Sequence, residues 1–163
     1  MKNIFYYDTV IGCIGIAEQD NCITNVVFEA DVIPAKSQGN GELVVHETQL
    51  IRDAAQQLNE YLKGERQLFS LPLAPEGTPF MKKVWDSLCR IPYGESRSYK
   101  QIAGDVGNSK ASRAVGLANN RNPIPLIIPC HRVIGSNGKL TGYRGGLDLK
   151  LKLLELEKGH GNF

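Results

Sequence analysis

The sequence has no long apolar run and no closely paired cysteines. None of its apolar stretches approaches the roughly 20 residues that a membrane-spanning helix needs. The first residues also lack the apolar region and cleavage site of a signal peptide, so we expect a cytoplasmic protein. The four cysteines, at positions 13, 22, 89 and 130, form no Cys-x-x-Cys pair. Because cytoplasmic cysteines are reduced, we predict free thiols, and we expect no membrane partner.

The first half of the chain has few basic residues, and the second half has few acidic ones. Residues 1–77 hold 5 Lys and Arg against 11 Asp and Glu, a net charge of −6. Residues 78–163 hold 14 against 6, a net charge of +8, although the whole chain carries only +2. A basic half beside an acidic half favours nucleic acid as the partner of the basic half. Charge that serves only solubility is the alternative.

The patterns of the first half predict a small α/β domain, an antiparallel sheet with one helix. Three segments have the composition of strands: 3–7, 11–17 and 22–28. Residues 47–63 have helical periodicity, and Gly64 marks the expected end of the helix. Residues 37–41 predict a flexible loop. This half shows no pattern that indicates chemistry.

A linker separates this domain from a second, mainly α-helical one. Residues 71–77 contain two prolines and a glycine, so we place the domains at 1–76 and 77–163. Thr78 followed by Pro79 predicts a capped helix start with proline at the first helical position. A final helix is expected from Leu147 to about Lys158.

Two short helices in the basic half predict a helix-turn-helix, in a winged-helix-like arrangement. A capping box at 98–101 begins a helix over 99–105, and a glycine then breaks it. Asn108 or Ser109 is expected to cap a second helix over 110–119. Helical hairpins of other kinds share this pattern, so its composition has to decide between them.

The composition of the second helix is compatible with DNA binding. Lys110, Ser112 and Arg113 stand there among alanines and glycine. Small side chains let a helix approach a DNA groove closely, and they equally let it pack on another helix. Both interpretations stay open at this point, and the positive charge of this half favours DNA.

Cys130 stands at the end of an apolar run and is followed at once by His131 and Arg132. Imidazole or cationic neighbours hold a reactive cysteine as thiolate, whereas a structural cysteine has apolar neighbours and is inert. In an extended chain, the side chains of Cys130 and His131 would point to opposite sides. A water molecule between the thiol and the imidazole is then the natural path for the proton.

Glu157 is a charged residue on the apolar face of the predicted last helix. At about 100° per residue from Leu147, it falls at about 280°, between Leu153 and Leu154 on the apolar face. A carboxylate there needs a partner. A fraying last turn or a pair with Lys150 is one interpretation. The other is that Glu157 orients a buried histidine, which would complete a Cys-His-carboxylate relay.

The residues around Pro129-Cys130-His131-Arg132 resemble the active-site signature of the O6-alkylguanine-DNA alkyltransferases, or methylated-DNA–protein-cysteine methyltransferases. The resemblance covers about 78–158 and includes the segments 98–101, 112–116, 122–123 and 143–146. It implies a protein that binds double-stranded DNA containing O6-alkylguanine, enters the minor groove with a recognition helix and flips the damaged base. The alkyl group passes irreversibly to the cysteine, so each molecule acts once. O4-alkylthymine is a second candidate substrate.

The resemblance implies catalytic roles for five residues. Cys130 is the nucleophile, and His131 is the base that acts through a water molecule. Glu157 completes the relay, and Asn122 is the hinge residue that orders the cysteine-bearing loop. Tyr99 assists base flipping at the neighbouring phosphate and can donate a proton toward the guanine ring.

It also implies roles in binding the substrate and the DNA. Arg113 fills the space left by the flipped base, with Ser112 and Lys110 on the same DNA-binding helix. Tyr143 walls the base pocket, and the backbone N–H of Arg144 faces the O6 atom. The carbonyls of Cys130 and Val133 read the guanine amino group.

We expect no cofactor and no metal, and a protein that acts as a monomer. Some relatives bind zinc in their N-terminal half, but Cys13 and Cys22 do not fall where that pattern has its ligands.

Three other functions remain as alternatives. A non-catalytic alkylguanine-binding protein of the same architecture would lack the cysteine, which this chain keeps. A thiol hydrolase with a Cys-His-Glu triad would not need the helix-turn-helix. A transcriptional regulator would not need the Cys-His pair.

Overall fold

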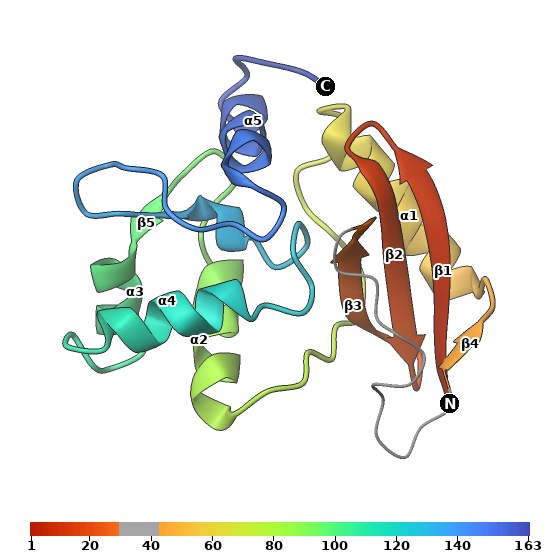
Figure 1. Cartoon of the computed structure of the whole chain (residues 1–163), viewed down its shortest axis with the longest axis horizontal. Helices are drawn as coiled ribbons and strands as arrows, with labels where there is room; N and C mark the ends of the chain where they lie inside the picture. The colour runs from red at the N-terminus through yellow and green to blue at the C-terminus, as the bar shows by residue number, and fades with distance from the viewer. Residues whose placement is uncertain (30–42) are drawn as a thin grey trace. The chain divides into compact units, whose positions relative to one another are not determined.

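The computed structural model describes residues 1–29 and 43–163, so the loop expected at 37–41 lies outside the described residues. The chain forms two compact units, which are residues 1–75 with Phe163 and residues 76–162 (Figure 1). All four cysteines are free thiols, as predicted. Among the described helices, none is long and apolar enough to cross a membrane.

The first unit contains a four-stranded sheet in the order β3-β2-β1-β4. Its strands are β1 (Lys2–Thr9), β2 (Gly12–Gln19), β3 (Cys22–Phe28) and β4 (Leu43–Val45). The first three pair antiparallel, as predicted, whereas β4 pairs parallel to β1 and makes the sheet mixed. The sequence does not predict β4, because three residues are too few to show a strand periodicity. Asp20 and Asn21 form the β2–β3 turn with φ of 52° and 61°, a region that Asp and Asn tolerate.

In the described part of this unit, the helix α1 (Gln49–Leu62) packs against the sheet (Figure 1). It begins two residues later than the predicted 47, because Thr48 caps it: the Thr48 hydroxyl accepts the N–H of Ile51 at 3.2 Å. It ends at Leu62, and Gly64 lies just beyond its cap with a left-handed φ of 77°. Six residues form its buried side: Ile51, Ala54, Ala55, Leu58, Tyr61 and Leu62. Burial of each large apolar side chain stabilises the unit by about 1.5–3 kcal/mol.

The second unit begins with α2 (Pro79–Cys89), which starts as the sequence predicts. Thr78 accepts the N–H of Met81 at 3.2 Å, and Pro79 occupies the first turn. The indole Nε1–H of Trp85 donates to the carbonyl of Ala118 at 2.9 Å, so α2 is tied to the end of α4 (Ser112–Asn120). The helix α3 (Tyr99–Asp105) has both bonds of the predicted capping box.

The helix-turn-helix is formed by α3 and α4, but α4 begins later than the sequence predicts. Its first residue is Ser112, and no side chain caps it. The side chain of Asn108 instead accepts the N–H of Lys110 at 3.1 Å, and its carbonyl accepts that of Ala111 at 3.0 Å. The predicted cap at Asn108 or Ser109 is therefore wrong, because Asn108 closes a local turn of its own.

The rest of the unit consists of short elements and a last helix. These are β5 (Arg97–Ser98), the 3₁₀ turn η2 (Cys130–Arg132), β6 (Val133–Ile134), parallel to β5, and α5 (Leu147–Glu157). Leu147 and Leu151 are 48% and 45% exposed, so the buried face of α5 is rotated away from its first leucines. Glu157 and Lys150 both lie on the buried face.

Gly77 allows a close packing that a larger residue would disturb. A Cβ at this position would overlap the Trp85 ring, with ring atom Cζ3 only 2.8 Å away. We expect Gly77→Ala to lower the free energy of unfolding by about 1–3 kcal/mol, because the tryptophan would have to shift. Denaturant unfolding of the intact chain measures the change.

Gly104→Ala is the matched control. Apart from its chain neighbours and the backbone of its own helix, no heavy atom of the described residues lies within 4 Å of a Cβ placed there, and the position is helical. We expect it to raise the free energy of unfolding by about 0.5–1 kcal/mol, because alanine has the better helix propensity. Equal effects of the two substitutions would contradict the packing argument.

Candidate active site

Asn122 shapes the loop that carries Cys130. Its side-chain N–H donates to the carbonyl of Ile128 at 2.8 Å, and its Oδ1 accepts the N–H of Ile124 at 2.9 Å. The N–H of Cys130 then donates to Ile128 at 2.8 Å. One buried side chain thus ties the corner after α4 to the residues just before the cysteine, which is the position that the sequence analysis expects for it.

Cys130 and His131 begin a 3₁₀ turn, not the extended segment that their apolar flanks indicate. Successive side chains of such a turn point about 120° apart, because the turn has three residues per repeat. The thiol and the imidazole are still directed apart, so the reason for placing a water molecule between them stays the same. Both side chains are buried.

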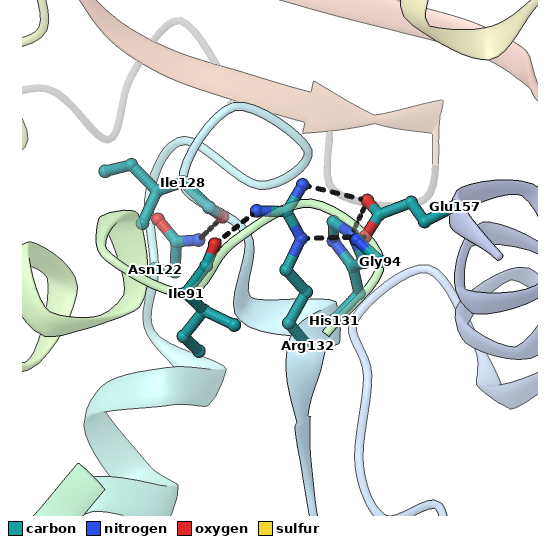
Figure 2. A network of polar contacts seen from close by, with 7 residues as sticks. All are labelled: Ile91, Gly94, Asn122, Ile128, His131, Arg132 and Glu157. Carbon is teal, nitrogen blue, oxygen red and sulfur yellow. Dashed lines mark hydrogen bonds and ion pairs between the residues drawn. The ribbon is translucent and has the colours of Figure 1, made fainter. Parts of the chain in front are cut away.

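Glu157 is shared by the two residues that follow Cys130 (Figure 2). Its Oε2 lies 2.7 Å from His131 Nε2. Arg132 donates Nε–H to Oε1 at 2.8 Å and Nη2–H to Oε2 at 3.1 Å. The side chains of His131 and Glu157 are 0% and 1% exposed. The carboxylate is thus buried and paired, which is the condition for keeping a charge in the interior.

Arg132 also anchors this network to the segment after α2. Its Nη1–H donates to the carbonyl of Ile91 at 2.7 Å, and the N–H of Gly94 reaches Glu157 Oε1 at 3.4 Å. Figure 2 shows the guanidinium between Ile91 and Glu157. Of the two roles that the sequence leaves open for Glu157, the structure has the contact with a buried histidine. Lys150 instead donates to the carbonyl of Thr141 at 2.7 Å.

Burial dominates the electrostatics of the thiol. It raises the pKa of Cys130 to about 11, while the Asn122 side chain and the charges of Lys150 and Arg144 act in the opposite direction. The expectation that the neighbours of Cys130 hold it as thiolate is therefore wrong for the free chain. The thiol is protonated near neutral pH and needs a base.

His131 has the protonation state of a base. Burial lowers its pKa, and the hydrogen bond to Glu157 only partly opposes that effect. The ring is therefore neutral near neutral pH. When Nε2–H donates to Glu157, the other ring nitrogen, Nδ1, carries the lone pair that can accept a proton.

Lys150 is a member of the site that the sequence analysis does not find. It is 0% exposed, and burial lowers its pKa to about 8, while the neighbouring Cys130 acts to raise it. Its ammonium favours the thiolate form of Cys130. Its position at about 300° on the wheel of α5, beside Glu157, is the signal that marks it as buried.

Tyr143, Arg144 and Val133 surround the cysteine and the histidine. The Tyr143 ring meets the His131 ring edge to face, with centroids 6.5 Å apart. Burial raises the pKa of Tyr143 well above its usual value, and Cys130 and Glu157 act in the same direction. Val133 is fully buried, and its N–H donates to the Cys130 carbonyl. The charge of Arg144 is felt by the thiol, although this residue is exposed.

The predicted DNA-binding residues lie on the helix-turn-helix. Lys110 and Arg113 are exposed, and Ser112 is half-buried at the first position of α4. Tyr99, at the start of α3, shares a hydrogen bond of 2.8 Å with the Thr141 hydroxyl. Since Lys150 donates to the Thr141 carbonyl, the loop before Tyr143 is held by both α3 and α5.

Asn119 is a second residue that the sequence analysis misses. It faces inward from α4, 3% exposed, and its Nδ2–H donates to the Cys130 carbonyl at 3.3 Å. No local signal distinguishes it from the exposed Asn120 beside it. In residues 1–29 and 43–163, no group of three or more His, Cys, Asp or Glu side chains could hold a metal ion.

Two family models together match nearly the whole chain. The model described as "6-O-methylguanine DNA methyltransferase, ribonuclease-like domain" matches residues 4–75. The model described as "6-O-methylguanine DNA methyltransferase, DNA binding domain" matches residues 79–159.

Individual relatives agree with these models. The methylated-DNA–protein-cysteine methyltransferase of Methanosarcina barkeri is 60% identical over 71% of this chain and 73% of its own length. The constitutive enzyme of Bacillus subtilis is 48% identical over 93% and 92%. The crystal structure of Mycobacterium tuberculosis OGT in complex with DNA is similar with a TM-score of 0.85 and 42% identity, over 98% of this chain and 95% of that one. The resemblance found in the sequence is confirmed: the chain belongs to the methylated-DNA–protein-cysteine methyltransferase family.

Proposed function

We propose that this protein repairs DNA by moving an alkyl group from O6-alkylguanine in duplex DNA to Cys130, once per molecule. The observation that carries the proposal is the buried Cys130 beside the His131–Glu157 pair, in a chain that belongs to this family. Two relatives named methylated-DNA–protein-cysteine methyltransferase, 60% and 48% identical to this chain, support the reaction. A relative described in complex with DNA supports duplex DNA as the partner.

The proton of the thiol has to leave before the cysteine can attack. Neutral His131 accepts it at Nδ1 through a water molecule, and Glu157 stabilises the imidazolium that forms. The thiolate attacks the alkyl carbon, a carbon–sulfur bond forms, and the bond from that carbon to O6 breaks. Its electron pair stays on the guanine, which takes a proton from the Tyr99 hydroxyl. The proton on His131 returns to Tyr99 through solvent, so no other reactant is needed.

Positive charge lowers the barrier to forming the thiolate. Lys150 is buried beside Cys130, and Arg144 adds charge from the pocket loop. An ammonium in a site shielded from water has a stronger effect on the thiol than it would have in solvent. Lys150 thus offsets part of the cost of burying the nucleophile.

The helix-turn-helix presents the DNA to this site. Lys110 and Ser112 contact phosphates at the start of α4, and Arg113 fills the space that the flipped guanine leaves. The base enters the pocket walled by Tyr143, where Val133 and Arg144 offer backbone groups. Exposure of Lys110 and Arg113 supports their contact with DNA.

The two domains have different roles. Residues 77–163 bind DNA and accept the alkyl group, and residues 1–76 support the fold. All the site residues come from one chain, so a monomer suffices. A reduced thiol is required, which favours a cytoplasmic protein, and the four free cysteines are consistent with it.

Intact mass after reaction with DNA tests the proposed function. We expect duplex DNA carrying one O6-methylguanine to add one methylene equivalent per protein, located on Cys130 by peptide mapping. Cys130→Ser should gain nothing. Cys89→Ser is the matched control, since Cys89 is an exposed thiol of the same unit, and it should react at the unaltered rate. Binding without a mass gain would favour an alkylguanine-binding protein, and repeated turnover would favour a hydrolase.

Glu157→Gln tests the relay. The amide keeps the shape of the side chain but loses the charge that stabilises the His131 imidazolium, so we expect transfer to slow at least about tenfold. Duplex binding, measured by fluorescence anisotropy, should change little. Glu155→Gln, exposed on the same helix, is the control and should transfer normally. Both variants are assayed below their melting temperatures, and a normal rate for Glu157→Gln removes this residue from the relay.

Lys150→Met tests the charge beside the thiol. Loss of the ammonium raises the pKa of Cys130 further, so less thiolate is present at any given pH. The pH profile of Cys130 alkylation by iodoacetamide, followed by peptide mass, should move to higher pH. Lys152→Met, exposed two residues later, should leave the profile in place. An unchanged profile for Lys150→Met would show that its charge does not act on the thiol.

A further inference from the structure

Asn119 holds the nucleophile from the DNA-facing helix. Its Nδ2–H donates to the Cys130 carbonyl at 3.3 Å, and the backbone N–H of Val133 donates to the same oxygen. A carbonyl oxygen has two lone pairs, and both donors bind the oxygen that the resemblance also assigns to the guanine amino group. The peptide group that follows Cys130 is therefore fixed from two directions, by its own 3₁₀ turn and by α4.

Stability does not explain why position 119 is an asparagine. Its Oδ1 is buried and meets no hydrogen-bond partner among the described residues. An unsatisfied buried acceptor costs about 1–3 kcal/mol, whereas a neutral hydrogen bond contributes only about 0.5–1.5 kcal/mol. An apolar side chain of similar size would avoid that cost, and residues that lower stability in this way are typical of functional sites.

Asn119 lies between the exposed start of α4 and the segment that carries Cys130. Arg113 is exposed near the start of α4, and Asn119 is buried near its end, about 9 Å further along the helix axis. Trp85 holds the carbonyl of the neighbouring Ala118 at 2.9 Å, so this end of α4 is fixed against α2. Asn122, just beyond the helix, holds the Ile128 carbonyl on the other side of Cys130. Two amides from the end of α4 thus bracket the nucleophile.

We propose that Asn119 is a positioning residue for the alkyl transfer: its amide fixes the Cys130 carbonyl and so sets the direction of the thiol relative to a base presented by α4. This inference rests on the proposed function. It adds a residue that contacts neither the DNA nor the reacting atoms and acts through the backbone of Cys130. A small error in the direction of attack is costly, because transfer needs the sulfur, the carbon and the leaving oxygen nearly in line.

Single-turnover kinetics of Asn119→Leu on duplex DNA with O6-methylguanine test the proposal. Leucine has a similar size, and it removes both the amide donor and the unsatisfied acceptor. We expect the transfer rate at saturating DNA to fall at least about tenfold, equivalent to ~1.4 kcal/mol. The half-saturating DNA concentration should be unchanged or lower, and the melting temperature unchanged or higher. A purely structural role predicts the opposite, a lower melting temperature with a normal rate at saturation, and that result would overturn the proposal.

A second variant and a control distinguish the positioning of Cys130 from a general loosening of the unit. Asn119→Asp keeps the shape but turns an acceptor toward the Cys130 carbonyl, and it should also transfer slowly. Ser87→Ala changes another buried polar side chain of the same unit, on α2, and should transfer normally. Equal slowing in Ser87→Ala would attribute the effect to loosening of the unit.

Hydrogen exchange tests whether Asn119 restrains the backbone at Cys130, without any alkyl transfer. Amide exchange in residues 130–133 should be faster in Asn119→Leu than in the unaltered protein, and unchanged in Ser87→Ala. Unchanged exchange in Asn119→Leu would overturn the proposal even if the transfer rate fell. The unaltered protein is assayed alongside, and its own methyl gain tests the proposed function separately from the role of Asn119.

Discussion

The buried carboxylate of Glu157 is the constraint on which the second unit depends. A charge without water must be matched, and here Arg132 provides two hydrogen bonds and His131 a third. Arg132 in turn binds the Ile91 carbonyl, so the end of α5, the segment after α2 and the turn at Cys130 meet at one group. Removing Arg132 would leave the buried carboxylate without an opposite charge, and removing Glu157 would leave the buried guanidinium without one. The same network that orients His131 therefore also holds the unit together.

The second consequence of burial concerns the nucleophile. An interior thiol is inert near neutral pH because the thiolate is poorly solvated, and here burial raises the pKa of Cys130 to about 11. A buried, protonated thiol reacts slowly with alkylating agents in solution. It reacts when a flipped guanine brings its alkyl group into the pocket. The cost is offset within the site by a neutral histidine and a buried lysine. Reactivity in this arrangement depends on geometry as much as on charge, which gives the amides of Asn119 and Asn122 their importance.

Local signals predict the secondary structure well where a few neighbouring residues decide it. Thr78 caps α2 with Pro79 in its first turn, the 98–101 capping box has both bonds, and Gly64 follows the end of α1. The prediction is wrong where a side chain has two local choices. Asn108 closes its own turn, so α4 starts at Ser112. It also misses β4, whose pairing with β1 joins segments about 40 residues apart and is set by tertiary packing.

Four features can be predicted from the residues alone: the family, the two-part layout, the nucleophile with its neighbouring histidine, and the anomalous carboxylate of the last helix. These follow from residue types at fixed spacing, which the covalent chain imposes. Three contacts depend on the folded chain: Glu157 with His131 and Arg132, Lys150 near Cys130, and Asn119 with the Cys130 carbonyl. The physical reason is that periodicity shows which side of a helix is buried, whereas the partner of a buried polar group is chosen by elements that are distant in the chain.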